Sequence, residues 1–379
     1  MKKLFLIAFS FVPVLFFAAR YYLSHNTLYL CLFALFLLVN GILILFLKKK
    51  LLIQYWFGLA FSAMFIDIIF TKIELGSFVA SIKNINVVPL FGASLLILLS
   101  SVVQTFRWKV ILGREKALNF SDLYPSVMIG HLFNHILPAK GGELVRTYHF
   151  GNAFGVSKLS TLSTLLIERI FDGLMALSFL FFFLLFLKKG YSDLSFMGIG
   201  GLVIYGGAFL AAFLFFKFND GFSALLKKIF PGVSSEKLLK HVKSFSEGLK
   251  ILNNPKSLAS VTFLSLIMWV IIALSIVPIM RLFDFNLPFY ASFCILACIC
   301  LGMTLPSAPG GIGIISIATV FAVGLIYKGM GVGIDSVLYS KIVLFSLLIN
   351  IVMVLPEVIV GLFFAFRTGI KQLKFIEEI

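Results

Sequence analysis

Apolar runs of about twenty residues recur from one end of this 379-residue chain to the other. The hydrocarbon core of a bilayer is about 30 Å thick, so a helix that crosses it needs about 20 mostly apolar residues. Hydrophobic residues make up 60% of the chain and charged residues 13%. No interval is polar enough for long enough to form a separate soluble domain. The sequence therefore predicts an all-α integral membrane protein, because backbone groups inside lipid must find hydrogen bonds within their own helix.

Eight of the apolar runs have the length and continuity of membrane-spanning helices. We expect these spans at 4–22, 28–47, 51–70, 88–107, 160–187, 197–216, 258–281 and 339–366. Two further apolar segments, 121–137 and 289–327, are interrupted by proline and glycine and do not fit single spans.

Basic residues decide the expected orientation. The net charge is +16, and the Lys and Arg residues gather at the ends of the apolar runs and in loops 48–50, 107–116 and 217–257. Such loops remain cytoplasmic, which places both termini inside a cell (inner or cytoplasmic) membrane and makes a nucleic-acid partner unexpected. The orientation is consistent only if 121–137 enters and leaves on the cytoplasmic side and 289–327 on the outer side. We therefore expect about eight spans and two re-entrant elements, arranged as a pseudo-inverted repeat.

This topology divides the chain into three parts. We expect N-terminal transmembrane helices at 1–70, a membrane domain at 71–366 and a cytoplasmic tail at 367–379. The loop 217–257 contains an amphipathic stretch with apolar side chains at helical spacing. Such a helix either lies flat in the membrane interface or packs beneath the bundle.

The first interrupted segment ends in a sequence suited to binding an anion. Pro138 ends a helix, Gly141-Gly142 permits a sharp turn, and a new helix begins near Glu143. The start of a helix exposes unpaired N–H groups and the positive end of its dipole. With Lys140 and Arg146 beside it, this helix start predicts an anion site at membrane depth.

The second interrupted segment repeats the same pattern in the other half of the chain. Leu305-Pro306 is followed by Pro309-Gly310-Gly311 and Gly313. Inverted repeats whose broken helices meet near the midplane are typical of many transporters. The alternative is that both sets of Pro and Gly residues serve helix packing only.

Three charged residues lie inside the apolar run 160–187. Glu168 and Asp172 are four residues apart and share a helix face, while Arg169 is three residues from Asp172. Each charge at the centre of a spanning helix costs about 2.5–3.5 kcal/mol on insertion scales. We expect the carboxylates to pair with Arg146 or Lys140. They form either a structural ion-pair network or part of a polar cavity that accepts a lipid phosphate.

Other polar residues within the apolar runs are few. His131 and His135 lie four residues apart beside Asn134, and we expect hydrogen-bonding roles for them rather than metal binding, because a third ligand is missing. Glu357 is a second intramembrane acid and a candidate proton carrier. The chain has no Walker loop and no hydrolase triad, and we expect neither a cofactor nor a metal.

Three motifs in order resemble a known family. They are N-x-x-L-P-x-x-G-G-E-x-x-R at 134–146, E-R-x-x-D at 168–172 and P-G-G-x-G at 309–313. This order is similar to the flippase-like membrane region of lysylphosphatidylglycerol synthases, over roughly 70–366. The resemblance implies a polytopic bundle with two re-entrant elements, associated with moving lipids between leaflets. The residues carried over by motif match are Lys140, Glu143, Arg146, Glu168, Arg169 and Asp172.

The chain departs from that family in two respects. The family often places an acid three residues after the last glycine of the third motif, where this chain has Ser316. The soluble aminoacyltransferase domain of the synthases is also missing, so synthase activity is not expected.

The predicted function is the flipping of an anionic phospholipid or polyprenyl-phosphate lipid through a polar cavity between the re-entrant helices, without enzymatic chemistry. Membrane lipids are the expected partners, and a homo-oligomer is compatible with this function. The alternatives are a membrane-embedded glycosyl- or acyl-transferase, or a non-catalytic partner of a lipid enzyme. The predicted substrate-binding residues are Asn134, Lys140, Gly141, Gly142, Glu143, Arg146, Glu168, Arg169, Asp172, Pro309, Gly310, Gly311 and Gly313.

Overall fold

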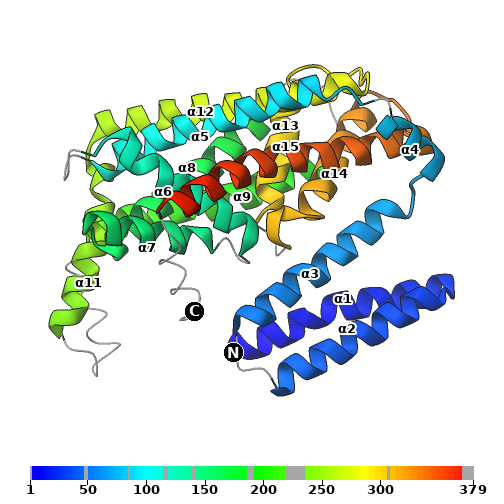
Figure 1. The fold of residues 1–379 in the computed structure, drawn as a ribbon, viewed down its shortest axis with the longest axis horizontal. Coiled ribbons are helices and arrows are strands. Elements are labelled where there is room, and N and C mark those ends of the chain that lie inside the picture. Colours follow the sequence, from blue (N-terminus) through cyan, green and yellow to red (C-terminus); the bar gives the residue numbers. More distant parts are fainter. Residues whose placement is uncertain are drawn as a thin grey trace.

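Every regular element in the described part of the chain is a helix (Figure 1). The computed structural model describes residues 2–46, 50–83, 85–113, 118–137, 141–185, 192–218, 235–304 and 308–368. The helices are α1 (Lys2–Ser24), α2 (Thr27–Phe46), α3 (Lys50–Phe70), α4 (Leu75–Lys83), α5 (Val88–Leu112), α6 (Phe120–Ile136), α7 (Gly142–Phe154), α8 (Lys158–Leu185), α9 (Ser192–Lys217), α11 (Ser235–Gly248), η2 (Lys250–Asn253), α12 (Pro255–Leu282), α13 (Ala291–Gly302), η3 (Pro309–Gly311), α14 (Ile314–Gly329) and α15 (Ser336–Thr368).

Each of the eight predicted spans coincides with a helix of similar bounds. In the part of the chain that the structure describes, four segments are long and apolar enough to cross a membrane. They are Val88–Leu112, Pro255–Leu282, Pro309–Gly329 and Ser336–Thr368. Shorter apolar helical segments of 10–17 residues lie at Val12–Ser24, Thr27–Asn40, Gly58–Phe70, Leu202–Lys217 and Ala291–Gly302. These helices fit an all-helical, multi-pass membrane protein.

The C-terminal end of α5 differs from the end predicted from the sequence. The predicted span 88–107 placed Arg107 at the start of a basic cytoplasmic loop, but α5 continues to Leu112 and the Arg107 side chain is completely buried. Carboxylates of α8 compensate its charge, which removes the need for contact with water or headgroups. The assignment of Arg107 to an exposed loop is therefore wrong.

Three long helices form the frame of the bundle. Helices α5, α12 and α15 run side by side along the long axis of the molecule (Figure 1). The largest apolar cluster lies among α12, α13, α14 and α15, with fully buried side chains such as Ala273, Ile295 and Phe345. A second cluster joins α5, α8 and α12 around Trp108 and Leu165.

Two pairs of shorter helices pack inside this frame. Helix α6 contacts α7 and α13 contacts α14, so each pair forms a helical hairpin. In Figure 1 the first hairpin lies toward one end of the bundle and the second toward the other. Helix α6 of the first hairpin also contacts η3, which lies in the turn between α13 and α14, so the two hairpins approach each other there. Pro138, Lys140 and Pro306 lie outside the described residues.

Helices α1 and α2 pack together beside α3 (Figure 1). Arg20, Tyr29 and Asp67 join these three helices: Arg20 Nε lies 3.0 Å from Asp67 Oδ2, and the Tyr29 hydroxyl donates to Asp67 Oδ1 at 2.9 Å. Helix α3 in turn contacts α14.

The amphipathic stretch predicted in 217–257 forms α11 and packs against α8. Gly248 lies so close to Ser160 and Ser163 that a side chain would collide with them. Val242, Leu249 and Leu252 are buried, whereas Lys240 and Lys243 are exposed. The apolar face of this stretch is thus buried against the bundle at α8.

The contact between α6 and α15 depends on Gly361. A Cβ atom there would lie 2.6 Å from the Met128 carbonyl oxygen and 2.7 Å from Leu132 Cβ. We expect Gly361→Ala to lower stability by about 1–3 kcal/mol, the usual cost of overpacking. Thermal unfolding in detergent measures the change. Gly207→Ala in α9, where nothing lies within 4 Å of the added methyl, is the matched control. Equal melting temperatures for the two variants would contradict the close packing.

Candidate functional site

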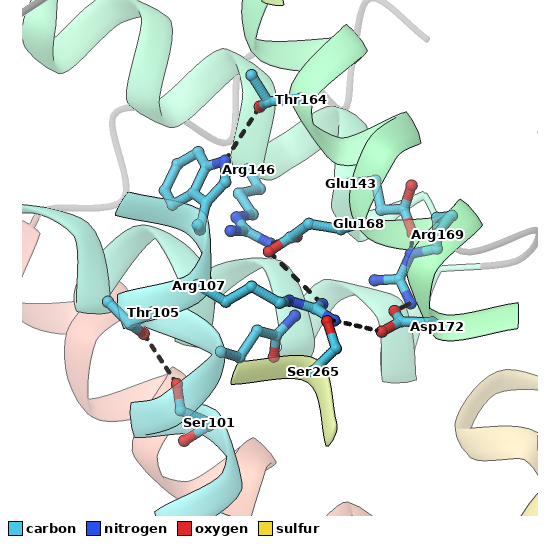
Figure 2. Close-up of polar contacts among 12 residues, drawn as sticks. Ser101, Thr105, Arg107, Glu143, Arg146, Thr164, Glu168, Arg169, Asp172 and Ser265 are labelled. Carbon is cyan, nitrogen blue, oxygen red and sulfur yellow. Dashed lines mark hydrogen bonds and ion pairs between the residues drawn. The ribbon is translucent and has the colours of Figure 1, made fainter. Parts of the chain in front are cut away.

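Three arginines and three carboxylates converge inside the bundle in the described part of the chain. Helix α5 contributes Arg107, α7 contributes Glu143 and Arg146, and α8 contributes Glu168, Arg169 and Asp172. Figure 2 shows Glu168 between Arg146 and Arg107, and Asp172 between Arg107 and Arg169. We call these six residues the arginine–carboxylate network. Its formal charges sum to zero.

Glu168 is the most buried acid of this network. Its carboxylate accepts a hydrogen bond from Arg146 Nη1 at 2.8 Å and lies 3.7 Å from Arg107 Nη2. The side chains of Glu168 and Arg107 are completely buried, and that of Arg146 is 3% exposed. The pairing with Arg146 expected from the sequence is therefore present. Lys140, the other expected partner, lies outside the described residues.

Asp172 lies one turn further along α8 and also bridges two arginines. Arg107 donates to Asp172 Oδ1 at 2.7 Å and Arg169 donates to Oδ2 at 3.2 Å. The indole of Trp269 on α12 donates to the same carboxylate at 3.3 Å. Arg107 also donates to Ser265 of α12 at 3.1 Å. Asp172 and its partners thus tie α5, α8 and α12 together.

An aromatic ring supports the inner arginine. The guanidinium carbon of Arg146 lies 3.8 Å from the ring centre of Trp108 on α5. The Trp108 indole donates to Thr164 of α8 at 3.0 Å, which fixes the ring. Cation–π contacts are stronger when they are desolvated, as this one is. Two helices therefore hold the Arg146 guanidinium in place.

The network is closed at one side and open at the other. Glu168 and Arg107 are fully buried, whereas the Arg169 and Glu143 side chains, which pair with each other, are 34% and 21% exposed. A path of charged groups thus leads from the open edge to the buried centre.

Several buried polar atoms near the centre lack a hydrogen-bond partner among the described residues. They are Arg107 Nε and Nη2, Arg146 Nε and Nη2, Asn134 Oδ1, Thr147 Oγ1 and Glu168 Oε1; of these, Arg107 Nη2 and Glu168 Oε1 face each other at 3.7 Å. Buried polar groups are nearly always satisfied, so such unused groups need an explanation. Guanidinium N–H groups are well suited to the oxygens of a phosphate or carboxylate. The network can therefore accept an anionic group without losing all of its internal pairs.

The helix start predicted from Gly141-Gly142 lies beside the unused Asn134 Oδ1 atom, one turn before Arg146. Helix α7 begins at Gly142 after Gly141. A Cβ atom on Gly142 would collide with the Gly130 carbonyl oxygen and the Asn134 amide nitrogen, so the backbones of α6 and α7 touch here. Gly130 in turn packs against the Arg146 side chain. Glycine at 130 and 142 is what allows α7 to bring Arg146 to Glu168.

The second predicted turn is built differently from the first. Gly310, Gly311 and Gly313 have φ of 72°, 67° and 87°, a region that favours glycine. Ser62 of α3 holds this turn, because its hydroxyl donates to the Ile312 carbonyl at 2.6 Å and accepts from the Ala308 amide at 2.8 Å.

Asn350 of α15 also holds the turn by donating to the Gly310 carbonyl at 3.0 Å. The expected helix start at Gly310-Gly311 is displaced, because Pro309–Gly311 forms η3 and α14 begins only at Ile314. Ser316 is buried in the first turn of α14. Among the described residues, the side-chain hydrogen bonds to this turn come from Ser62 and Asn350 rather than from the arginine–carboxylate network.

Glu357 does not lie alone in α15. His131 Nδ1 and His135 Nε2 each lie 2.8 Å from its Oε2 atom. His131 Nε2 lies 2.8 Å from Gln104 Oε1 on α5. The spacing of the two histidines indicated a shared face, but the partner, 222 residues from His135, could not be read from the sequence. In the described residues, no group of three His, Cys, Asp or Glu side chains is arranged to hold a metal ion.

A double-mutant cycle tests the inner pair. Removing one partner of a buried ion pair leaves an uncompensated charge and costs about 3–5 kcal/mol. We therefore expect Glu168→Gln and Arg146→Met to lower the melting temperature strongly, and the double variant to be more stable than the sum of the two losses predicts. Additive losses in thermal unfolding would show that the two side chains do not interact.

Comparison with known proteins identifies the chain's relatives. The family described as lysylphosphatidylglycerol synthase TM region matches residues 55–361. A UPF0104 membrane protein of Methanocaldococcus jannaschii is 25% identical over 214 residues, which cover 52% of this chain. The chain spans 62% of the length of that relative. No solved structure matches the chain. Because the matched region covers most of the chain, this protein belongs to the family of lysylphosphatidylglycerol synthase transmembrane regions.

Proposed function

We propose that this protein translocates an anionic lipid, a phospholipid or a polyprenyl-phosphate lipid, between the leaflets of the cell membrane. The family fits a lipid-related role in the membrane. The observation that carries the proposal is the arginine–carboxylate network with its unused guanidinium donors, buried beside the start of α7. A structural network alone needs no surplus of buried donors.

In this proposal the lipid phosphate enters at the open edge of the network. Arg169 and Glu143 are the exposed pair at that edge, and Arg146 is the inner cation. The phosphate takes the place of a carboxylate at a guanidinium group, so each arginine keeps an anionic partner. The acyl or polyprenyl chains remain in the hydrocarbon, where they need no protein contact. Exchange of one anion for another avoids leaving a bare charge in the membrane interior.

The proposal includes the membrane topology. The eight predicted spans cross the bilayer, the α6–α7 hairpin enters from the cytoplasmic side, and the α13–α14 hairpin enters from the outer side. Two observations support this arrangement: the hairpins lie toward opposite ends of the bundle, and α6 contacts η3 where they approach each other. Helix starts facing a shared interior are how many transporters bind anions. No step requires a bond to be made or broken, so the proposed role is transport rather than enzymatic conversion.

Labelling of single cysteines tests the topology. In a background without the four native cysteines, we place one cysteine at Ser157, between α7 and α8, or at Asp335, before α15; both sites are exposed. A membrane-impermeant maleimide should label Asp335→Cys in intact cells and Ser157→Cys only after permeabilisation. Labelling of Ser157→Cys from outside would show that the α6–α7 hairpin crosses the membrane an odd number of times.

Lipid movement in proteoliposomes tests the function. Fluorescent anionic phospholipid in the outer leaflet is quenched chemically, and the fraction that becomes accessible reports translocation. We expect the wild-type protein to move the lipid, Arg146→Ala to lose most of this activity, and Arg146→Lys to retain part of it, because lysine keeps the charge but not the planar donor geometry.

Arg281→Ala is the matched control, since Arg281 is an exposed arginine at the end of α12. Each variant is checked for folding by its melting temperature. A folded Arg146→Ala protein with wild-type translocation would remove Arg146 from the proposed site. Recovery of chemically altered lipid after incubation would instead support a transferase.

A further inference from the structure

A second group of titratable side chains lies where α6 meets α15, apart from the arginine–carboxylate network. His131 and His135 are one turn apart on α6, so both imidazoles face the same side. Each places a ring nitrogen 2.8 Å from Glu357 Oε2. The side chains of both histidines are 19% exposed and that of Glu357 is 11% exposed, so the group is mostly buried yet accessible.

The contacts of His131 indicate where protons lie in this group when Gln104 presents its amide oxygen. One ring nitrogen faces the Glu357 carboxylate and the other faces the amide oxygen of Gln104 at 2.8 Å. Both oxygens are acceptors, and an imidazole satisfies two acceptors only when both of its nitrogens carry a proton. The geometry therefore points to a charged His131. His135 needs one proton, on Nε2, to donate to Glu357. One imidazolium and one carboxylate leave the group neutral.

The surroundings add no second cation to Glu357 among the described residues. Helix α5 contributes the neutral Gln104, and η3 has no titratable side chain. On α7, Arg146 packs against Gly130 and pairs with Glu168. His149 of α7 contacts the Ser126 hydroxyl of α6 at 2.8 Å rather than Glu357. The charge of Glu357 is thus balanced by the imidazoles of α6.

We propose that His131, His135 and Glu357 form a proton-binding site that couples proton movement to lipid translocation; this inference rests on the proposed function. Loss of the second His131 proton leaves Glu357 without a counter-charge and removes the donor to Gln104. An unpaired carboxylate at membrane depth is costly, and chains of acidic residues and histidines carry protons in pumps and transporters. The protonated group holds α6 against α15, and deprotonation releases this contact.

The frame of the protein connects this site to the arginine–carboxylate network. Gln104 and Arg107 lie three residues apart on α5 and share a face. Gln104 contacts His131, while Arg107 contacts Glu168 and Asp172. The α6–α7 hairpin carries His131 on one helix and Arg146 on the other. A shift of α6 relative to α15 therefore moves the element that holds the inner cation.

The first arm of the test measures proton binding without transport. The chain has five histidines, and nitrogen NMR of the protein labelled with 15N-histidine distinguishes imidazolium from neutral rings. At neutral pH we expect the wild-type protein to show an imidazolium signal from His131. His131→Gln should remove this signal, and Glu357→Gln should convert it to the signal of a neutral ring. The matched control is Glu247→Gln, which removes a carboxylate on α11 and should leave the signal unchanged. A neutral His131 in the wild-type protein would mean that Gln104 presents its amide nitrogen, and would overturn the proposal.

The second arm measures coupling in proteoliposomes of anionic phospholipid, with and without a pH gradient. We expect the gradient to change the translocation rate of the wild-type protein and of the control Glu247→Gln. The variants Glu357→Gln and His131→Gln should lose this response to the gradient. Both variants should still move lipid when the pH is equal on the two sides. A wild-type translocation rate that is the same with and without the gradient would overturn the proposed coupling but would not contradict the proposed function. A wild-type protein that moves no lipid would overturn both, whereas the NMR arm still decides whether the protons are bound as described.

Discussion

The ion pair between Arg146 and Glu168, together with Arg107, is the interaction on which the arrangement of the bundle depends. These side chains come from α7, α8 and α5, and each is almost completely buried. In a membrane the apolar faces of helices gain little by leaving lipid, so polar contacts and close packing have a larger share in setting helix positions than in water. An arginine left without its carboxylate would have no counter-charge and no water. In the proposed function, another anion takes over the guanidinium groups before the three helices separate, so that the same interaction holds the fold and binds the lipid headgroup.

Glycines determine where that interaction can form. The backbone of α7 touches that of α6 at Gly142 and Gly130, and α6 touches α15 at Gly361. Small residues at such contacts let helices approach closely in membranes. The result is a stack of α7, α6 and α15 with little room between backbones, in which the position of Arg146 follows from the position of α15. Packing from α6 and charge pairing with α8 and α5 thus constrain α7 from two directions.

The sequence predicts some of this arrangement and misses other parts for physical reasons. Helix positions follow from apolar runs, because span length is set by the bilayer, and Glu168 with Asp172 is conspicuous because charges are rare inside such runs. Arg107 is missed because a basic residue at the end of an apolar run has the same local pattern whether it faces headgroups or a buried carboxylate. The pairing of Glu357 with His131 joins residues from opposite halves of the chain, and no local spacing records it. The clamp of Ser62 on the Gly310 turn is hidden for the same reason, since serine is common in spanning helices and its partners are backbone groups.

Helix α15 is the element that contacts the polar parts of both hairpins. Asn350 holds the turn before α14, and Glu357 holds α6; they are seven residues apart and therefore on one face of the helix. Pro356 lies between them, and proline within a helix removes a backbone hydrogen bond and favours bending. The two halves of α15 are thus joined at a weak point between their two contacts. In the proposed coupling, a change at Glu357 alters the angle of the segment that contacts α6, while Asn350 keeps its hydrogen bond to Gly310. One hairpin can then move relative to the other without unpacking the apolar core around Phe345, which is what alternating exposure of a buried site to the two leaflets requires.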